Sequence, residues 1–294
     1  LMVKASAGGG GRGIRLVEHP EDLEAAITAA KQEALNFFGN DEVYMEKFIV
    51  NPKHIEVQIL ADSYGNTVYL GERDCSMQRR NQKVLEETPS PIMTPELRAK
   101  MGKAAVAAAK ACGYTNAGTI EFLVDADRNF YFMEMNTRIQ VEHPITEAVT
   151  GIDLVKQQIL IANGEKLPFA QEDITIRGHA IECRINAENP ALNFRPSPGQ
   201  ITALHIPGGP GIRVDSSAYQ GYTIPPYYDS MIAKLIVHAP TREEAIAKMK
   251  WALAEFIVDG VDTNIDFQLS LIRDSLFEKG TYDIGYLGRK LSGK

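Results

Sequence analysis

The sequence predicts an α+β protein, and three observations support this class. First, several segments alternate polar and apolar residues with the period of a β-strand, as in HIEVQILAD (54–62), GTIEFLVD (118–125) and NFYFMEMN (129–136). Second, helix-start signals stand elsewhere: Thr94-Pro95-Glu96 opens an Ala-rich stretch, and Thr241 forms a capping box with Glu244. Third, short strands separated by Gly and Pro dominate after about residue 175.

The first fifty residues predict a small mixed unit. LMVKAS (1–6), IRLV (14–17) and VYMEKFI (43–49) are strand-like. Between the second and third of these, apolar residues recur at helical spacing after Pro20, and Gly39 is typical of a helix end. The chain therefore predicts two strands, a helix and a further strand in this region.

The remaining elements follow in chain order. The strand at 54–62 turns through DSYGN into a returning strand, TVYLGER (67–73), and the polar segment at 74–87 is expected to be a loop. The Ala-rich helix is expected to stop at Gly113, and Asp153 caps a helix that ends near Gly164. The capping box begins a helix through Phe256, and one further helix is expected over 265–277.

Composition excludes several classes of function. The chain has 294 residues, 44% of them hydrophobic, which is enough for a sizeable buried core. With a net charge of −7 and no dense Lys/Arg block, nucleic acid and anionic membranes are not expected partners. Cys75, Cys112 and Cys183 match no zinc spacing and indicate a reducing cytoplasm.

A glycine-rich loop, AGGGGRG (7–13), lies between the first two strands. It matches the dinucleotide pattern G-x-G-x-x-G only formally, because it leads into a strand and not a helix. Its backbone N–H groups can close over phosphates, with Lys4 just before it as a positive charge. A plain flexible surface turn remains the alternative.

Two acidic residues are expected to face each other on a hairpin. If strands 118–125 and 129–136 pair symmetrically about the turn at 126–129, Leu123 faces Phe132 and Glu121 faces Glu134. Two ionised carboxylates so placed repel each other unless a positive charge lies between them. A hard divalent cation bound between the two carboxylates would remove this repulsion, and Asn136 offers one more oxygen on the same face. The alternative is a solvated edge strand.

The stretch MEMNTRIQVEHP (133–144) continues this polar row beyond the hairpin. Arg138 can bind an oxyanion in a bidentate manner, Gln140 can donate and accept hydrogen bonds, and Glu142 can act as a base. A metal site that leads into an anion site with a base at its end is suited to activating a small oxyanion with a nucleotide phosphate.

Together these motifs closely resemble the biotin carboxylases, which are ATP-grasp ligases, and in particular the separate subunit of bacterial acetyl-CoA carboxylase. The resemblance covers the whole chain and is carried by KASAGGGGRG, YMEKF, ERDCSMQRRNQK, EMNTRIQVEHP, ECRINAE and PPYYDSMIAKL. It departs from the family at Asn81, where many members have His, and the family's N-terminal domain is not present before Leu1.

The resemblance implies a role for each site residue. Catalytic roles fall to Glu142, Arg138, Arg184 and Lys83, of which Glu142 is the base and Arg184 stabilises the biotin enolate. Locally, Arg184 is also explained by a structural salt bridge to Glu182 or Glu188. Bicarbonate would be held by Lys83, Arg138, Gln140 and the backbone of Val141. Mg²⁺ or Mn²⁺ would bind Glu121, Glu134 and Asn136. ATP would contact Lys4, Gly9, Gly10, Glu46, Lys47, Ile49, His54 and Gln78.

The resemblance also implies an organisation and partners. Residues 1–49 would be the remainder of the ATP-grasp lid, 50–174 the ATP-grasp body, and 175–294 a β-rich C-terminal domain. The reaction would carboxylate biotin on a separate carrier protein through carboxyphosphate, with carboxyltransferase subunits using the product in cytoplasmic fatty acid synthesis. A homodimer is implied. Without the N-terminal domain, this fragment alone can be inactive.

Three alternatives stay open at this point. Another ATP-grasp ligase would activate a different carboxylate, although ECRINAE and PPYYDS favour biotin carboxylase. A truncated chain could be an inactive scaffold that only dimerises or docks a carrier. The parent protein could also be a longer, fused carboxylase.

Overall fold

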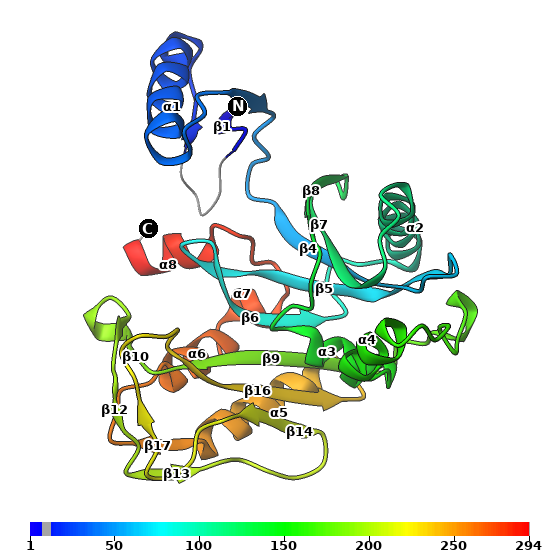
Figure 1. The fold of residues 1–294 in the computed structure, drawn as a ribbon. Helices are drawn as coiled ribbons and strands as arrows, with labels where there is room; N and C mark the ends of the chain where they lie inside the picture. Colours follow the sequence, from blue (N-terminus) through cyan, green and yellow to red (C-terminus); the bar gives the residue numbers. More distant parts are fainter. Residues whose placement is uncertain (8–12, 294) are drawn as a thin grey trace. The chain divides into compact units, whose positions relative to one another are not determined.

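A computed structural model describes residues 1–7 and 13–293 (Figure 1). The chain divides into two compact units, Leu1–Val50 and Asn51–Lys294. Both combine helices with antiparallel sheet, so the predicted α+β class is confirmed.

The first unit contains a three-stranded sheet covered by one helix. The strand order is β2-β1-β3, with β1 at Met2–Ala5, β2 at Ile14–Leu16 and β3 at Val43–Glu46. A short 3₁₀ turn, η1 (Pro20–Asp22), leads into α1 (Leu23–Phe38). Gly39 ends α1 in the left-handed conformation at φ 69°, which glycine adopts without steric cost, as its sequence position predicted.

The second unit is built on one eight-stranded antiparallel sheet. Its strand order is β14-β16-β9-β6-β5-β4-β7-β8, and Figure 1 shows the central strands running side by side across this unit. The strands are β4 (Lys53–Ala61), β5 (Thr67–Arg79), β6 (Gln82–Thr88), β7 (Asn116–Val124), β8 (Phe130–Asn136), β9 (His179–Asn186), β14 (Ile212–Ser216) and β16 (Met231–Ala239).

Six short strands form three separate pairs in the same unit. These are β10 (Glu188–Asn189) with β11 (Arg195–Pro196), β12 (Gly199–Gln200) with β15 (Thr223–Ile224), and β13 (Ala203–His205) with β17 (Ile257–Asp259). They account for the Gly- and Pro-rich texture that the sequence shows after residue 175.

Helices pack on the apolar faces of this sheet, which the alternation of apolar residues along its strands creates. The helices are α2 (Pro95–Ala111), α3 (His143–Thr150), α4 (Leu154–Ala162), α5 (Arg242–Glu255), α6 (Ile265–Ile272), α7 (Ser275–Glu278) and α8 (Tyr286–Ser292), with 3₁₀ turns η2 (Gln171–Asp173) and η3 (Pro190–Leu192). Helix α2 packs on β4 and β5. Helix α5 packs on β9 and β16, and its core includes Met77 and Leu85.

The predicted helix starts are confirmed by their hydrogen bonds. The hydroxyl of Thr94 accepts from the N–H of Leu97 at 3.2 Å, and the carboxylate of Asp153 accepts from the N–H of Lys156 at 2.8 Å. Thr241 accepts from the N–H of Glu244 at 3.2 Å. Each cap satisfies a backbone donor that a helix end leaves unpaired.

Three sequence predictions about elements were wrong or incomplete. The polar segment 74–87 is not a loop: β5 and β6 form a hairpin through Arg80 and Asn81, which have φ of 51° and 63°. Its acidic residues Asp74, Glu86 and Glu87 are buried in ion pairs, which hydropathy does not reveal. The predicted helix 265–277 is two helices, because Asp274 accepts from the N–H of Leu276 and starts α7. Helix α3 was not anticipated.

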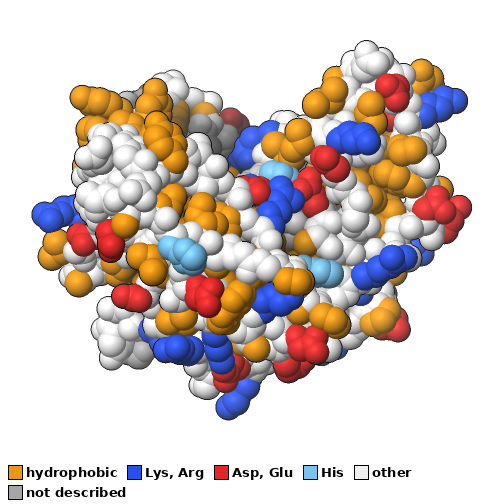
Figure 2. Space-filling model, turned by 90° about the horizontal axis from the view of Figure 1, so that it is seen from below, with side chains coloured by type: hydrophobic (Ala, Val, Ile, Leu, Met, Phe, Trp, Pro, Cys, Tyr) orange, Lys and Arg blue, Asp and Glu red, His pale blue; other side chains and the backbone are white. Residues whose placement is uncertain are grey.

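The surface agrees with the composition. On the face drawn in Figure 2, acidic and basic side chains are scattered among apolar ones without a continuous basic area. Among the helices of residues 1–7 and 13–293, none is long and apolar enough to cross a lipid bilayer.

Candidate active site

Strand β4 carries a buried row of polar side chains. Its alternation places Ile55, Val57 and Ile59 toward the core under α2, so His54, Glu56 and Gln58 lie on the opposite face of the sheet. All nine residues of β4 are buried. Because buried charges need partners, this polar face has to be matched by groups from neighbouring strands.

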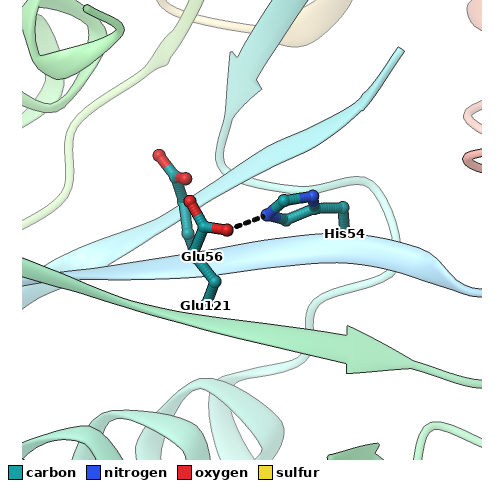
Figure 3. Close-up of side chains that lie close together, drawn as sticks. All are labelled: His54, Glu56 and Glu121. Carbon is teal, nitrogen blue, oxygen red and sulfur yellow. Dashed lines mark ion pairs between the residues drawn. The ribbon is translucent and has the colours of Figure 1, made fainter. Parts of the chain in front are cut away.

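Two carboxylates meet at the centre of this face. Glu56 on β4 lies directly opposite Glu121 on β7 in the antiparallel register. Figure 3 shows both carboxylates and the His54 imidazole gathered on one side of the two strands. His54 Nε2 lies 3.0 Å from Glu121 Oε2. Facing ionised carboxylates repel, so a cation is expected beside them.

Lys83 supplies that cation. Its ammonium Nζ lies 2.5 Å from Glu56 Oε2, 2.9 Å from Glu121 Oε1 and 2.7 Å from Glu142 Oε1. Burial alone would raise the pKa of Glu56, but the positive charges of Arg73 and Lys83 outweigh it and lower the pKa to about 2. The three carboxylates in turn raise the pKa of Lys83, so the ammonium stays charged.

Arg73 hydrogen-bonds several polar side chains on the same face of the sheet. Arg73 was not predicted as a site residue from the sequence. It is fully buried and donates to Glu56 Oε1 at 2.5 Å, and to Gln140 Oε1 at 3.1 Å. It also donates to Gln58, Thr119 and Thr146. The contact with Gln140 fixes that amide so that its Nε2 donates to Glu121 at 2.7 Å. The sequence placed Arg73 at the end of the predicted strand 67–73, without indicating its partners.

Glu142 links this cluster to Arg184. It stands at the N-cap position of α3, where Oε1 accepts from Lys83, while Oε2 accepts from Arg184 at 2.9 Å. Arg184 also donates from Nε to Glu86 Oε1 at 2.7 Å. The salt bridge considered for Arg184 from the sequence, to Glu182 or Glu188, was therefore wrong, because its partners come from other elements.

The acidic hairpin has the predicted facing pair but a different register. Glu121 does face Glu134, whereas Leu123 faces Tyr131 and not Phe132 as predicted. A bulge between these positions shifts the pairing by one residue and restores the predicted partner of Glu121.

The side chains beyond Glu134 form a smaller group of their own. Glu134 is exposed, and its carboxylate accepts from Asn136 at 3.3 Å. Arg138 is also exposed, follows the end of β8, and donates to Asn136 Oδ1 at 3.2 Å. The structure thus places Glu134, Asn136 and Arg138 together, outside the buried Lys83 cluster.

The donor chemistry of the hairpin fits a hard divalent cation. Glu121, Glu134 and Asn136 offer only oxygen ligands, the type that Mg²⁺ prefers. Within the described residues, the compact groups of possible ligands are His54 with Glu56 and Glu121, and Glu56 with Cys75 and Glu142. Both include carboxylates already paired with Lys83, so the exposed carboxylate of Glu134 is the more accessible ligand.

The remaining predicted residues are distributed over both units. Val141 accepts from Lys234 Nζ at 2.9 Å through its carbonyl oxygen, and the Gln78 amide lies 2.7 Å from His54 Nδ1. In the first unit, Lys4 on β1 forms an ion pair with Glu46 on β3. Also in that unit, Ile49 is buried and Lys47 is exposed. Gly9 and Gly10 lie outside the described residues.

Comparison with known families gives two matches along the chain. Residues 1–170 match the family described as "Carbamoyl-phosphate synthase L chain, ATP binding domain". Residues 182–289 match the "Biotin carboxylase C-terminal domain". The two matches follow one another without overlap and together cover nearly the whole chain.

Individual relatives agree with this. "Biotin carboxylase 1" of Bacillus subtilis is 58% identical over 98% of this chain, and this chain spans 64% of its length. One of the subunits of pyruvate carboxylase from Methanothermobacter thermautotrophicus is 57% identical over 95% of this chain and 57% of its own length.

A solved structure gives the same answer for the fold. The biotin carboxylase domain dimer of Hydrogenobacter thermophilus 2-oxoglutarate carboxylase, in complex with MgADP, ADP and bicarbonate, superposes with a TM-score of 0.91. It is 52% identical, and the match covers 98% of this chain and 64% of that one. This chain, with an ATP-grasp fold followed by a biotin carboxylase C-terminal domain, belongs to the biotin carboxylase family.

Proposed function

We propose that the protein containing this chain carboxylates biotin on a carrier protein, with ATP and bicarbonate as co-substrates and carboxyphosphate as intermediate. The observation that supports this best is the position of Glu142. Its two oxygens lie 2.7 Å from Lys83 and 2.9 Å from Arg184, so one carboxylate connects two partly buried cations. Such a carboxylate can accept a proton while the cations hold the anions it acts on.

Bicarbonate would bind among Lys83, Arg138, Gln140 and the backbone of Val141. On binding, the anion would replace a carboxylate as a partner of Lys83, whose ammonium already sits among three of them. Glu142 would then take the bicarbonate proton, and the resulting carbonate would attack the γ-phosphate of ATP, forming carboxyphosphate with ADP as the leaving group. Arg73 keeps Gln140 and Glu56 in place during this step.

Biotin would be carboxylated after carboxyphosphate releases CO₂ and phosphate. The phosphate would take the ureido N1′ proton, and Arg184 would stabilise the negative charge that develops on the ureido oxygen. The deprotonated N1′ would then attack CO₂ to form carboxybiotin. Glu86 and Glu142 orient the Arg184 guanidinium for this task through bonds of 2.7 and 2.9 Å.

The nucleotide and its metal ion would occupy the remaining predicted positions. Mg²⁺, or Mn²⁺, would neutralise phosphate charge when bound by Glu121, Glu134 and Asn136. The residues proposed to contact ATP are Lys4, Gly9, Gly10, Glu46, Lys47, Ile49, His54 and Gln78. In this proposal, residues 1–49 of the chain form the remainder of the ATP-grasp lid, residues 50–174 the ATP-grasp body and residues 175–294 the C-terminal domain.

The cellular setting is also a proposal. A biotin carboxyl carrier protein and carboxyltransferase subunits would be the partners, in acetyl-CoA carboxylase and fatty acid synthesis. The solved relative named above is described as a dimer, which supports a homodimer here. The three cysteines are free, which agrees with a reducing cytoplasm. The relative from a pyruvate carboxylase supports a second candidate parent, one that delivers the carboxyl group to pyruvate.

The test measures bicarbonate- and biotin-dependent ADP release. It compares this chain with a chimera in which the preceding residues of the B. subtilis relative are joined to Leu1. The chimera should turn over, and Glu142→Gln and Arg184→Met should each lower its kcat by about 10²-fold or more. Glu278→Gln, an exposed change on α7, serves as the control.

The possible results separate the hypotheses. No ATP cleavage in the chimera would refute the proposed activity. Cleavage by the chimera but not by this chain would assign the chain a partial role within a longer enzyme. A Glu142→Gln chimera with unchanged kcat would remove Glu142 as the base.

A further inference from the structure

Behind Arg184, two more glutamates face each other across the sheet. Glu86 on β6 lies directly opposite Glu182 on β9 in the antiparallel register. Both side chains are 0% exposed. Neither residue is among those proposed to bind a substrate or metal ion.

Their hydrogen bonds are unequal. Glu86 Oε1 accepts from Arg184 at 2.7 Å, which leaves Glu86 Oε2 without a partner among the described residues. Both oxygens of Glu182 are likewise buried and unpartnered within the described part of the chain. A carboxylate that is ionised, buried and unpaired is strongly disfavoured.

The charged groups around Glu182 do not remove this difficulty. Arg184, on the same strand, already donates hydrogen bonds to Glu86 and Glu142. From β16, Lys234 donates to the carbonyl of Val141 and lies 3.6 Å from Asp215. Glu142, at the start of α3, adds a further negative charge, and the His143 imidazole beside it lies 2.8 Å from the carbonyl oxygen of Gln140.

We propose that the Glu86–Glu182 pair holds one shared proton that resides mainly on Glu182, and that Glu182 is a positioning residue for Arg184. A neutral Glu182 can donate to the free Oε2 of Glu86, directly or through a water molecule. Glu86 then stays ionised and holds the guanidinium. If both residues were ionised, Glu182 would compete with Glu86 and Glu142 for Arg184 and displace it.

The electrostatics of the pair support this arrangement. Burial, together with the charge of Glu86, raises the pKa of Glu182 well above the usual range. Burial also raises the pKa of Glu86, to about 7, even though Arg184 opposes it. Two carboxyls that interact this closely titrate as a pair, in which the second proton is lost only at a raised pH.

The first experiment measures protonation through stability. If Glu182 is protonated in the folded chain, the folded state holds a proton that the unfolded chain releases near pH 4.5, so stability falls as pH rises above that value. Glu182→Gln keeps the neutral shape and removes this loss. Its urea midpoint should therefore exceed that of the original chain, by a margin that grows between pH 4.5 and 7.

Glu87→Gln is the matched control, from the neighbouring position on β6. Glu87 is also fully buried, but Arg242 and His179 lower its pKa to about 2 against the effect of burial. The stability it contributes is present above pH 4.5 and lost as pH falls toward 2, so Glu87→Gln should lower the midpoint at pH 7.

The outcomes decide the matter without reference to activity. A Glu182→Gln midpoint that is lower than, or equal to, that of the original chain at pH 7 would overturn the proposal. If Glu182→Gln does not fold, infrared difference spectra of the original chain supply the answer. A protonated-carboxyl C=O band that persists at pH 7 supports the shared proton, and its absence refutes it.

The positioning role of Glu182 toward Arg184 rests on the function proposed above, and a separate measurement, the pH dependence of kcat/KM, tests it. In the chimera, the alkaline decline of kcat/KM for free biotin should move upward in Glu182→Gln by on the order of one pH unit. An unmoved alkaline limb would refute the positioning role even if the shared proton is found. A chimera without any activity would count against the proposed function, and the stability measurement would still be informative.

Discussion

At the scale of single residues, the candidate site depends on compensation between buried charges. Lys83 balances Glu56, Glu121 and Glu142, and Arg73 braces the same face with five hydrogen bonds. Removing one member of a buried pair costs far more than the pair gains, because the remaining charge is left without a partner in a region of low dielectric. Lys83 and Arg73 therefore stabilise the fold around the candidate site.

Lys83→Met should lower the free energy of unfolding at pH 7 by about 3–5 kcal/mol, since it removes the cation that three carboxylates share. The pKa of Glu56, now about 2, should rise without Lys83. The carboxylates can then be neutralised by protonation, so the deficit should shrink as pH is lowered from 7 to 5. Urea unfolding at both pH values measures this.

Lys250→Met provides the control for that substitution. Lys250 pairs with Glu278 on the surface, where both side chains are about a third or more exposed, so its loss should cost less than about 1 kcal/mol. Equal effects of the two substitutions would mean that the Lys83 cluster contributes no more than a surface ion pair.

At the scale of elements, the strands and helices fit together through particular close contacts. Helix α2 lies on β4 and β5, and Gly102 in its middle is covered by the ring of Tyr69. A Cβ added at Gly102 would come within 2.5 Å of that ring. The intrinsic cost of glycine in a helix is accepted here because the helix has to approach the sheet closely.

Gly102→Ala should therefore destabilise the protein by about 1–3 kcal/mol, although alanine has the better helix propensity. Gly288→Ala in α8 is the matched comparison, because a Cβ there meets nothing within 4 Å. It should stabilise by about 0.5–1 kcal/mol. Thermal unfolding of both variants checks this, and a stabilising Gly102→Ala would show that Tyr69 moves away freely.

At the scale of the whole molecule, the large sheet crosses the boundary between the two family matches. Strand β6, within the first match (1–170), pairs with β9, most of which lies within the second match (182–289). One hydrophobic cluster contains Leu85 of β6 and Ile181 of β9, together with Met77 of β5 and Leu235 of β16. Residues 51–294 accordingly form one compact unit.

Truncation tests this directly. Residues 51–294 alone should fold cooperatively, because the unit retains its complete sheet and its own core. Residues 51–174 alone should not, because β6 would lose β9, one of its two partner strands, and Leu85 would be exposed to water. Circular dichroism and urea unfolding of the two fragments would decide, and cooperative folding of 51–174 would contradict the shared core.

The sequence was sufficient for features that depend on local periodicity and on long motifs. Capping residues such as Thr94 and Asp153 predicted helix starts correctly, because a cap is a contact within one turn. The α+β class followed from strand alternation. The family followed from motifs such as ECRINAE, which the comparisons then confirmed.

Only the tertiary structure decided how the charged residues are partnered. Arg184 pairs with Glu86 and Glu142, 98 and 42 residues away in the chain. Lys83 came from a segment (74–87) that its polarity marked as a loop, because hydropathy cannot distinguish a solvated charge from one neutralised by a neighbouring strand. Long-range register decides which charges meet, and with it the balance of buried acids and bases on which this site depends.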